Sequence, residues 1–440
     1  MMINSPKNSV ERMASASVWF FLDRTIRLVL GFVTSIFVAR HYGPGEWGGL
    51  SYVLASSILF GSIASAGSEN LIVRDLSKCD SEQERADIQK TAIVLRFGFG
   101  TFAYLSLLIL VAATQGFAPP FYLALIYGLI FIFQVGEIWE YRLRIEHHLP
   151  LVAKTHVCSS LLSSTLKIVT LLLGWPLIAI AVAMLVEYAT SLAILLRYRA
   201  RHWSIWVGKF QAKYAHTLLK ASSLLMLSSF LIACQSRSEF YLINHFLGLE
   251  ALGLYAAAFK CMELVDVLVL VFTMTLVPEL SKRHNLELPI LASRTYLLGI
   301  LFFISTLLPI AAIYFLFPWV YGEKYRVAQT LIPWLALRPL FIILGAIRSI
   351  FLVMEGRLRY VPICAAVGLV STLVAGSFLI PVWGLKGAAV SGLIGLAISN
   401  FAVDIFFQPQ NIARLFTSYR EFPYAMERCL EILKLRKTYA

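Results

Sequence analysis

The sequence predicts an all-α integral membrane protein with about twelve transmembrane helices in two pseudo-symmetric six-helix lobes. The first observation is composition: 59% of the 440 residues are hydrophobic and 14% are charged, whereas soluble domains have about 45–50% apolar and about 25% charged residues. The second is a series of apolar segments that each approach the roughly 20 residues needed to cross the hydrocarbon layer. The third is a resemblance between the two halves of the chain.

Two pairs of short motifs carry this resemblance. The motif R-H-Y-G-P-G-E-W-G-G-L-S around Glu46 matches N-H-F-L-G-L-E-A-L-G-L-Y around Glu250, and the shared residues lie 204 positions apart. The motif W-P-L-I-A-I-A-V-A-M-L from Trp175 matches W-G-L-K-G-A-A-V-S-G-L from Trp383. Repeated bundles of membrane helices are typical of transporters, which bind their substrate where the repeats meet. The repeat therefore predicts a transporter.

The predicted spans follow the apolar segments in order. Pro119-Pro120 and Pro278 break helices and mark boundaries, and Gly174-Trp175 leaves only a tight turn between the fifth and sixth spans. The spans are 17–38, 48–68, 91–113, 119–140, 152–173, 176–196, 217–236, 250–276, 294–317, 328–353, 360–381 and 387–407. They divide the chain into an N-terminal segment, a first lobe, a linker, a second lobe and a basic tail, which are 1–16, 17–196, 197–216, 217–407 and 408–440.

The placement of Lys and Arg predicts the orientation. Most basic residues outside the spans lie in the two terminal segments and in alternate loops, whereas the opposite loops hold only Arg40, Arg237, Lys324, Arg326 and Lys386. Because cytoplasmic loops carry an excess of Lys and Arg, both termini are predicted to be cytoplasmic. Basic residues on that face are attracted to anionic lipids, so the net charge of +13 does not require a nucleic-acid partner.

Ionisable residues inside the spans are the main functional candidates. Such a residue costs about 2.5–3.5 kcal/mol to insert and usually faces a bundle interior or a water-filled cavity. Asp23 and Arg27 are four residues apart and can pair on one helix face. The deeper residues are Arg27, Lys167, Glu187, Lys260, Glu263 and Arg348. For these residues a cavity-facing role and an internal salt bridge are both open.

Other charged residues lie near the predicted span ends. They are Arg96, Glu137, Glu140, Arg237 and Glu239. We interpret them as residues that reach the lipid headgroups, because long charged side chains extend to the interface.

The mixture of charges indicates a wet cavity for a phosphate-containing head. Arginine binds phosphate bidentately. A partly desolvated carboxylate binds a proton more readily, so Glu263 and Asp266, which share a helical stripe with Lys260, are candidates for binding H⁺ or Na⁺. The sequence has no Asp-x-Asp, Walker, HExxH or GxSxG motif. No catalytic residue, metal site or cofactor is therefore predicted.

Six motifs resemble those of the polysaccharide transport proteins. In chain order they are V-A-R-H-Y-G-P-G-E-W-G-G-L-S-Y-V-L-A, G-S-E-N-L-I-V-R-D-L-S-K, L-G-L-E-A-L-G-L-Y-A-A-A-F-K, L-V-P-E-L-S-K-R, V-Y-G-E-K-Y-R-V-A and W-G-L-K-G-A-A-V-S-G-L. The resemblance covers roughly residues 17–407. It places the chain in the superfamily of the MATE multidrug exporters and the lipid II flippases.

The resemblance implies a MATE-like flippase of the bacterial inner membrane. Such a protein moves an undecaprenyl-diphosphate-linked oligosaccharide to the periplasmic leaflet for O-antigen, capsule or exopolysaccharide assembly, through a central cavity that opens alternately to each side. Its partners would be membrane lipids and the polymerase and chain-length proteins of the pathway. The implied cationic lining is Arg24, Arg27, Lys167, Lys260 and Arg348. Antiport against H⁺ or Na⁺ is also implied, with Asp23, Glu187, Glu263 and Asp266 as coupling candidates.

Three alternatives remain open at this point. A drug exporter keeps the fold, but the basic groups in the spans disfavour cationic cargo. A membrane glycosyltransferase or polymerase would need an acidic external loop, which the sequence lacks. A scaffold for a glycan-assembly complex would tolerate neutral substitutions of the intramembrane charges.

Overall fold

The computed structural model describes residues 6–146, 148–202, 208–282, 288–355, 357, 359–407 and 415; of these it describes the backbone alone at 6–23, 202, 275, 277–282, 288–290, 353–354 and 406–407. Within these residues the chain is helical and has no β-strand. The chain forms two compact units, which divide between Ala233 and Cys234.

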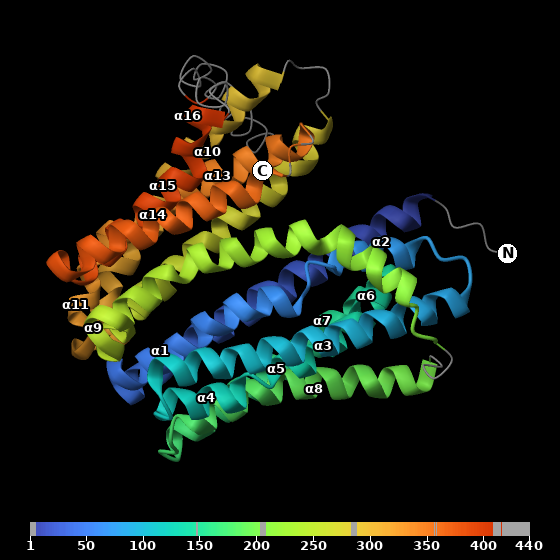
Figure 1. Cartoon of the computed structure of the whole chain (residues 1–440), viewed down its shortest axis with the longest axis horizontal. Helices are drawn as coiled ribbons and strands as arrows, with labels where there is room; N and C mark the ends of the chain where they lie inside the picture. Colours follow the sequence, from blue (N-terminus) through green and yellow to red (C-terminus); the bar gives the residue numbers. More distant parts are fainter. Residues whose placement is uncertain are drawn as a thin grey trace, which may run out of the picture. The chain divides into compact units, whose positions relative to one another are not determined.

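The N-terminal unit is built from long helices and one interrupted helix. Figure 1 shows that the axes of α3 and α8 are roughly parallel to that of α1. Helix α1 packs directly on α3 and α7, and α7 packs on α8. The elements are α1 (Pro6–Ala64), α2 (Glu69–Ser77), α3 (Glu82–Gln115), α4 (Pro119–Tyr127), α5 (Ile130–Phe133), η1 (Gln134–Gly136), α6 (Glu137–Ile145), α7 (Leu149–Leu172) and α8 (Ile178–His202).

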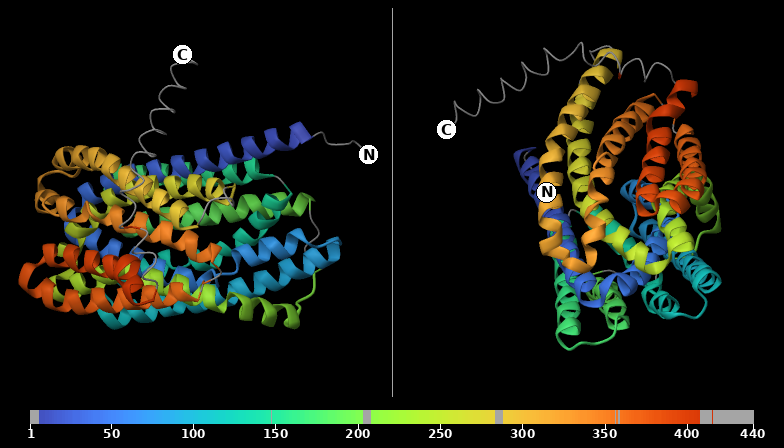
Figure 2. Two further views of the ribbon diagram at one scale, coloured as in Figure 1. Left: turned by 90° about the horizontal axis from the view of Figure 1, so that it is seen from above. Right: turned by 90° about the vertical axis from the view of Figure 1, so that its left-hand side faces the viewer.

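The C-terminal unit begins at Cys234, inside the longest helix, α9. Figure 2 shows the helices from two further directions. Its elements are α9 (Ala212–Lys282), α10 (Leu288–Tyr321), η2 (Glu323–Tyr325), α11 (Arg326–Gln329), α12 (Ile332–Leu335), α13 (Arg338–Met354), α14 (Tyr360–Trp383), α15 (Leu385–Ala397), η3 (Ile398–Ala402) and α16 (Val403–Phe407). The α14–α15 hairpin is closely packed: a Cβ on Gly387 would overlap the carbonyl oxygen of Leu379.

The repeated motifs mark the same structural features in both units. Helix α1 breaks at Gly43 (φ 81°) and helix α9 breaks at Gly248 (φ 83°), one residue apart when the motifs are aligned. This backbone conformation favours glycine because it has no Cβ. Each tryptophan motif also has a neighbouring glycine with a positive φ. Gly174, with φ 64°, lies just before Trp175 and ahead of α8, and Gly384, with φ 58°, lies just after Trp383 and ahead of α15. The internal repeat in the sequence is therefore reproduced in the fold.

The helices agree with a multi-pass membrane protein. Nine stretches of the described residues are long and apolar enough to cross a membrane, and one of them, Arg24–Ser77, contains most of the first predicted span and all of the second, separated by the Gly43 break. Helix α9, which contains the predicted seventh and eighth spans, is not among the nine. The all-helical membrane class is confirmed, and the total of twelve spans stays a prediction.

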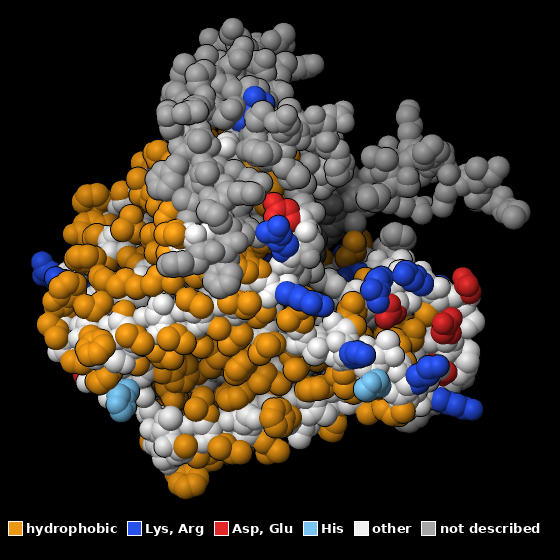
Figure 3. Space-filling model, turned by 45° about the horizontal axis from the view of Figure 1, so that its top comes forward, with side chains coloured by type: hydrophobic (Ala, Val, Ile, Leu, Met, Phe, Trp, Pro, Cys, Tyr) orange, Lys and Arg blue, Asp and Glu red, His pale blue; other side chains and the backbone are white. Residues whose placement is uncertain are grey.

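The surface of the helices is apolar. Leu172, Leu308 and Trp319 expose 80%, 78% and 83% of their surface, and Figure 3 shows hydrophobic side chains over most of the described surface in that view. A soluble protein rarely exposes apolar patches of more than a few hundred Å². Lipid is therefore the natural solvent for these faces.

The predicted linker 197–216 is largely helical in its described part. Helix α8 continues to His202, and α9 begins at Ala212. The first turns of α9 belong to the N-terminal unit because Leu218 packs in one apolar cluster with Ile72, Ile88 and Ile138. The two units therefore divide later than the predicted linker, and the functional domain ranges stay predictions.

Candidate functional site

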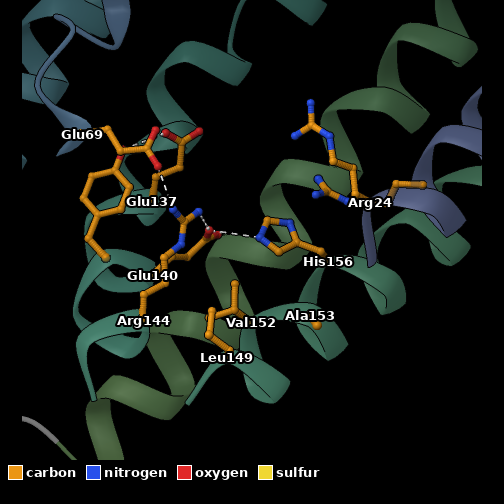
Figure 4. Close-up of a pocket in the computed structure, with 11 residues that line it drawn as sticks. Arg24, Glu69, Glu137, Glu140, Arg144, Leu149, Val152, Ala153 and His156 are labelled. Atoms are coloured by element: carbon orange, nitrogen blue, oxygen red, sulfur yellow. Dashed lines mark hydrogen bonds and ion pairs between the residues drawn. The ribbon is translucent and has the colours of Figure 1, made fainter. Parts of the chain in front are cut away.

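The N-terminal unit contains a charged pocket of about 300 Å³ between α1, α2, α6 and α7 (Figure 4). It lies at the end of the unit that carries the 69–90 and 141–154 segments, which the sequence predicts to be cytoplasmic. The pocket is lined by Arg24, Arg27, Glu69, Glu137, Glu140, Tyr141, Arg144, Leu149, Val152, Ala153 and His156.

Glu137 is held from behind the pocket by Arg96 of α3. One guanidinium nitrogen of Arg96 lies 2.5 Å from Glu137 Oε2, and another donates to the carbonyl oxygen of Ala64 at 2.9 Å. Ala64 ends α1, where the last carbonyl groups lack intrahelical partners. Arg96 therefore ties α1, α3 and α6 together beside the pocket.

Glu140 and Glu69 are held by cations of the pocket wall itself. His156 Nε2 lies 3.0 Å from Glu140 Oε2. Arg144 donates to Glu69 at 2.7 Å and lies 3.9 Å from Glu140. Figure 4 shows these carboxylates and Arg144 along one side, with His156 and Arg24 on the other. Each carboxylate of the lining thus has a cationic or imidazole partner.

Arg24 and Arg27 supply the remaining positive charge. Arg24 is exposed and forms no ion pair within the described part of the chain, and Arg27 is half-buried. The lining has three arginines against three glutamates, and Arg96, which pairs with Glu137 from behind the wall, adds a fourth arginine to the region. Because the three glutamates are bound to Arg96, Arg144 and His156, the exposed Arg24 favours an anionic ligand, and arginine matches phosphate geometry. The side chain of Asp23, predicted to pair with Arg27, lies outside the described residues.

Lys167 and Glu187 are brought into the interior of the same unit but do not line this pocket. Lys167 is buried on α7, on the helix face that also carries Ser160 and Ser163. Ser160 donates to Glu187 Oε1 at 2.8 Å. Their predicted roles in substrate binding and ion coupling stay predictions.

The predicted stripe of α9 in the C-terminal unit is engaged in ion pairs. Glu263 accepts from Lys260 at 2.7 Å and from Arg237 at 2.6 Å. Asp266 instead lies 3.3 Å from the Arg338 guanidinium of α13. The interaction of Lys260 with Glu263 agrees with their spacing on one stripe. Any ion bound by these carboxylates would compete with the bridges.

Arg348 also makes an internal bridge in the C-terminal unit. It is 3% exposed, donates to the carbonyl oxygen of Ser399 at 2.6 Å and lies 3.5 Å from Asp404. This geometry favours the salt-bridge alternative that the sequence left open. Substrate binding by Arg348 stays a prediction.

We expect Arg348→Met to weaken folding rather than binding. Loss of Arg348 should cost about 3 kcal/mol of stability because the buried Asp404 carboxylate loses its ion-pair partner and keeps the Tyr360 hydroxyl. Thermal unfolding of detergent-purified protein measures this change, with Arg197→Met, an exposed arginine of α8, as the control. Unchanged stability together with lost ligand binding would contradict this expectation and support a role of Arg348 in the substrate cavity.

The interpretation of the charges near span ends as headgroup residues is wrong for three of them. Arg96, Glu140 and Glu239 are 7%, 4% and 3% exposed, and Glu239 accepts from the Tyr255 hydroxyl at 2.8 Å. The spans predicted to end at 140 and 236 continue as helices beyond these residues, since α6 extends to Ile145 and the first part of α9 extends to the break at Gly248. These side chains therefore lie beside neighbouring helices, where they find internal partners.

Three residues of the pocket wall were not predicted as site residues. Glu69 and Arg144 lie in segments predicted to be loops, and His156 received no role. A signal for His156 was present, because it occupies the α7 face that continues through Ser159, Ser160, Ser163 and Lys167 at helical spacing.

The fold matches known transporter structures over nearly the whole chain. An inward-facing multidrug resistance MATE family transporter of the MOP superfamily is 16% identical, with a TM-score of 0.69, covering 92% of this chain and 99% of that one. The lipid II flippase MurJ in an inward closed conformation is 14% identical, with a TM-score of 0.66, covering 92% and 91%. A MOP superfamily transporter from Pyrococcus furiosus is 17% identical, with a TM-score of 0.62, covering 94% and 97%.

The fold and its apolar surface define a multi-pass helical membrane protein with the architecture of the MOP-superfamily transporters. At these identities the likeness establishes the fold alone. The comparison with curated proteins gave no significant match. A family model described as polysaccharide biosynthesis protein matches residues 15–284. The chain belongs to this family.

Proposed function

We propose that the protein is a flippase for undecaprenyl-diphosphate-linked oligosaccharides. It moves them from the cytoplasmic to the periplasmic leaflet of a bacterial inner membrane, with both of its termini in the cytoplasm, for O-antigen, capsule or exopolysaccharide assembly. Membership of the polysaccharide biosynthesis family supports a glycan-related cargo. The likeness to a lipid II flippase supports a fold able to carry a lipid-linked one.

The observation that carries the proposal is an arginine of the N-terminal pocket with which none of the pocket's carboxylates pairs. Arg24 is exposed to the pocket, while its carboxylates are held by Arg96, Arg144 and His156. A diphosphate carries the complementary charge and offers oxygens that arginine contacts bidentately. A volume of about 300 Å³ suits a diphosphate with an adjoining sugar better than a full oligosaccharide. In the proposed cycle the lipid tail stays in the bilayer while the head enters the pocket.

Ion coupling is a separate part of the proposal. We keep antiport against H⁺ or Na⁺, with Glu187, Glu263 and Asp266 as candidates. Glu263 and Asp266 are bridged to Lys260, Arg237 and Arg338, so uptake of an ion there requires a conformation in which these bridges open. Polymerase and chain-length proteins are proposed partners in the same pathway.

A leaflet assay in cells tests the proposed function. A strain without the protein and strains with Arg27→Ala or Lys167→Ala are labelled, and a membrane-impermeant sugar-modifying enzyme reads periplasmic access to the lipid-linked oligosaccharide. We expect access to be lost in the deletion strain and reduced in Arg27→Ala. Normal access in the deletion strain would overturn the proposal, and restored efflux of cationic dyes on complementation would favour a drug exporter.

A further inference from the structure

His156 is a titratable side chain in the wall of the pocket that the proposed function does not yet use. It lies near the start of α7, with 20% of its side chain exposed. Its Nε2 atom is 3.0 Å from Oε2 of Glu140, which is only 5% exposed. The imidazole is therefore held in place by a buried acceptor while one edge remains accessible.

The surroundings of His156 come from three other elements. The titratable and charged groups that share the pocket with it are Arg24 and Arg27 of α1, Glu69 of α2, and Glu137, Glu140, Tyr141 and Arg144 of α6. Glu69 and Glu137 are bound to Arg144 and Arg96. Arg24 and Arg27 are the cations of α1 that line the same pocket as His156.

The contact with Glu140 determines what protonation changes. An ionised carboxylate only accepts hydrogen bonds, so Nε2 is the donating nitrogen of the ring. Nδ1 is then an acceptor in the neutral imidazole and becomes a donor in the imidazolium. Neutral His156 would present a lone pair to an anion, whereas protonated His156 would present an N–H and a positive charge.

We infer that His156 binds a proton when an anionic head occupies the pocket and becomes a third cation beside Arg24 and Arg27. The inference rests on the proposed function and assigns to His156 a direct contact with the diphosphate. Histidine is the side chain that changes charge near neutral pH. An adjacent anion stabilises the imidazolium, so bound diphosphate promotes proton uptake and proton binding strengthens diphosphate binding.

At His156, proton binding and diphosphate binding strengthen each other, so His156 differs from the residue that would bind the exchanged ion in an antiporter. Substrate and proton bind together at His156, whereas an antiporter needs a group from which substrate binding expels the ion. His156 is therefore a substrate-binding residue whose charge sets affinity, and the exchanged ion binds elsewhere.

Titration calorimetry on the full-length protein in detergent tests the inference. The probe is geranyl-diphospho-N-acetylglucosamine, a soluble diphosphate diester that has no titrating group of its own near neutral pH. We expect its affinity to fall about tenfold between about pH 6 and pH 8, with net proton uptake that appears as a dependence of the heat on the buffer's ionisation enthalpy.

Two variants and one matched control complete the experiment. His156→Gln keeps an amide beside Glu140 but removes the titration, so affinity should be low and independent of pH. His156→Lys should bind with pH-independent, higher affinity. His216→Gln changes an exposed histidine outside the pocket and should behave as the unmodified protein does. A monodisperse gel-filtration profile verifies that each variant is folded.

The outcomes separate this inference from the proposed function. Probe binding with no pH dependence, or with the same dependence in His156→Gln, overturns the role of His156 and leaves the flippase proposal standing. Absence of probe binding at every pH overturns both. Equal affinity for short-chain phosphatidylglycerol would assign the pocket to lipid headgroups and overturn both.

Discussion

Replacing Arg24 and Arg27 together with alanine is expected to weaken binding of the diphosphate probe about 100-fold. Each charged hydrogen bond contributes about 1.5–3 kcal/mol, and every 1.4 kcal/mol is about a factor of ten in affinity. The double variant removes Arg24 and Arg27 from the pocket lining and keeps the Arg96–Glu137 and Arg144–Glu69 pairs. Calorimetry at a fixed pH measures the change.

The controls separate charge from geometry. Arg24→Lys with Arg27→Lys keeps both charges but loses the bidentate fork of the guanidinium, so we expect an intermediate loss of affinity. Arg197→Ala removes an exposed arginine of α8 outside the pocket and should leave affinity unchanged. If the double alanine variant binds the probe as tightly as the unmodified protein, the head does not bind in this pocket.

Replacing Arg96 with methionine should strongly destabilise the N-terminal unit. Arg96 is 7% exposed, and its loss leaves Glu137 without its ion-pair partner and the end of α1 without a donor. Removing one partner of a buried ion pair costs about 3–5 kcal/mol, which corresponds to a fall in melting temperature of about 10 °C. Thermal unfolding followed by fluorescence-detected gel filtration measures this fall.

A second substitution tests the reason for the loss. Glu137→Gln in the Arg96→Met background removes the uncompensated charge, so the double variant should recover much of the lost stability. Arg85→Met is the control, because its partner Glu82 is exposed and the pair contributes little. Full stability in Arg96→Met would mean that this bridge does not hold the pocket wall together.

The helical architecture was predictable because it depends on local composition. Apolar length predicted spans whose gaps contain Gly43 and Gly248, where α1 and α9 break, and the predicted tight turn at Gly174-Trp175 lies between α7 and α8. The interruption of the 119–140 span into α4, α5 and η1 was not predicted. In that stretch the hydrophobic pattern continues through the irregular turns, so the sequence carries little signal for them.

The pocket was predictable only in part. Arg24 and Arg27 stand out because they are charges inside an apolar span. Glu69, Arg144 and His156 come from three other elements, and their meeting depends on how α2, α6 and α7 pack. Pairing also depends on neighbouring helices: Asp266 shares a stripe with Glu263 yet pairs with Arg338 of α13. Spacing along one helix does not contain that information.

The most direct test of the central claim is transport by the purified protein in proteoliposomes. Undecaprenyl-diphosphate-linked oligosaccharide is placed in one leaflet, and its arrival in the other is read by an impermeant sugar-modifying enzyme. We expect the unmodified protein to transport this substrate but not phosphatidylglycerol, and we expect transport to be lost when Arg24→Ala and Arg27→Ala are combined. A rate equal to that of protein-free vesicles, or unchanged transport by the double variant, would contradict this claim.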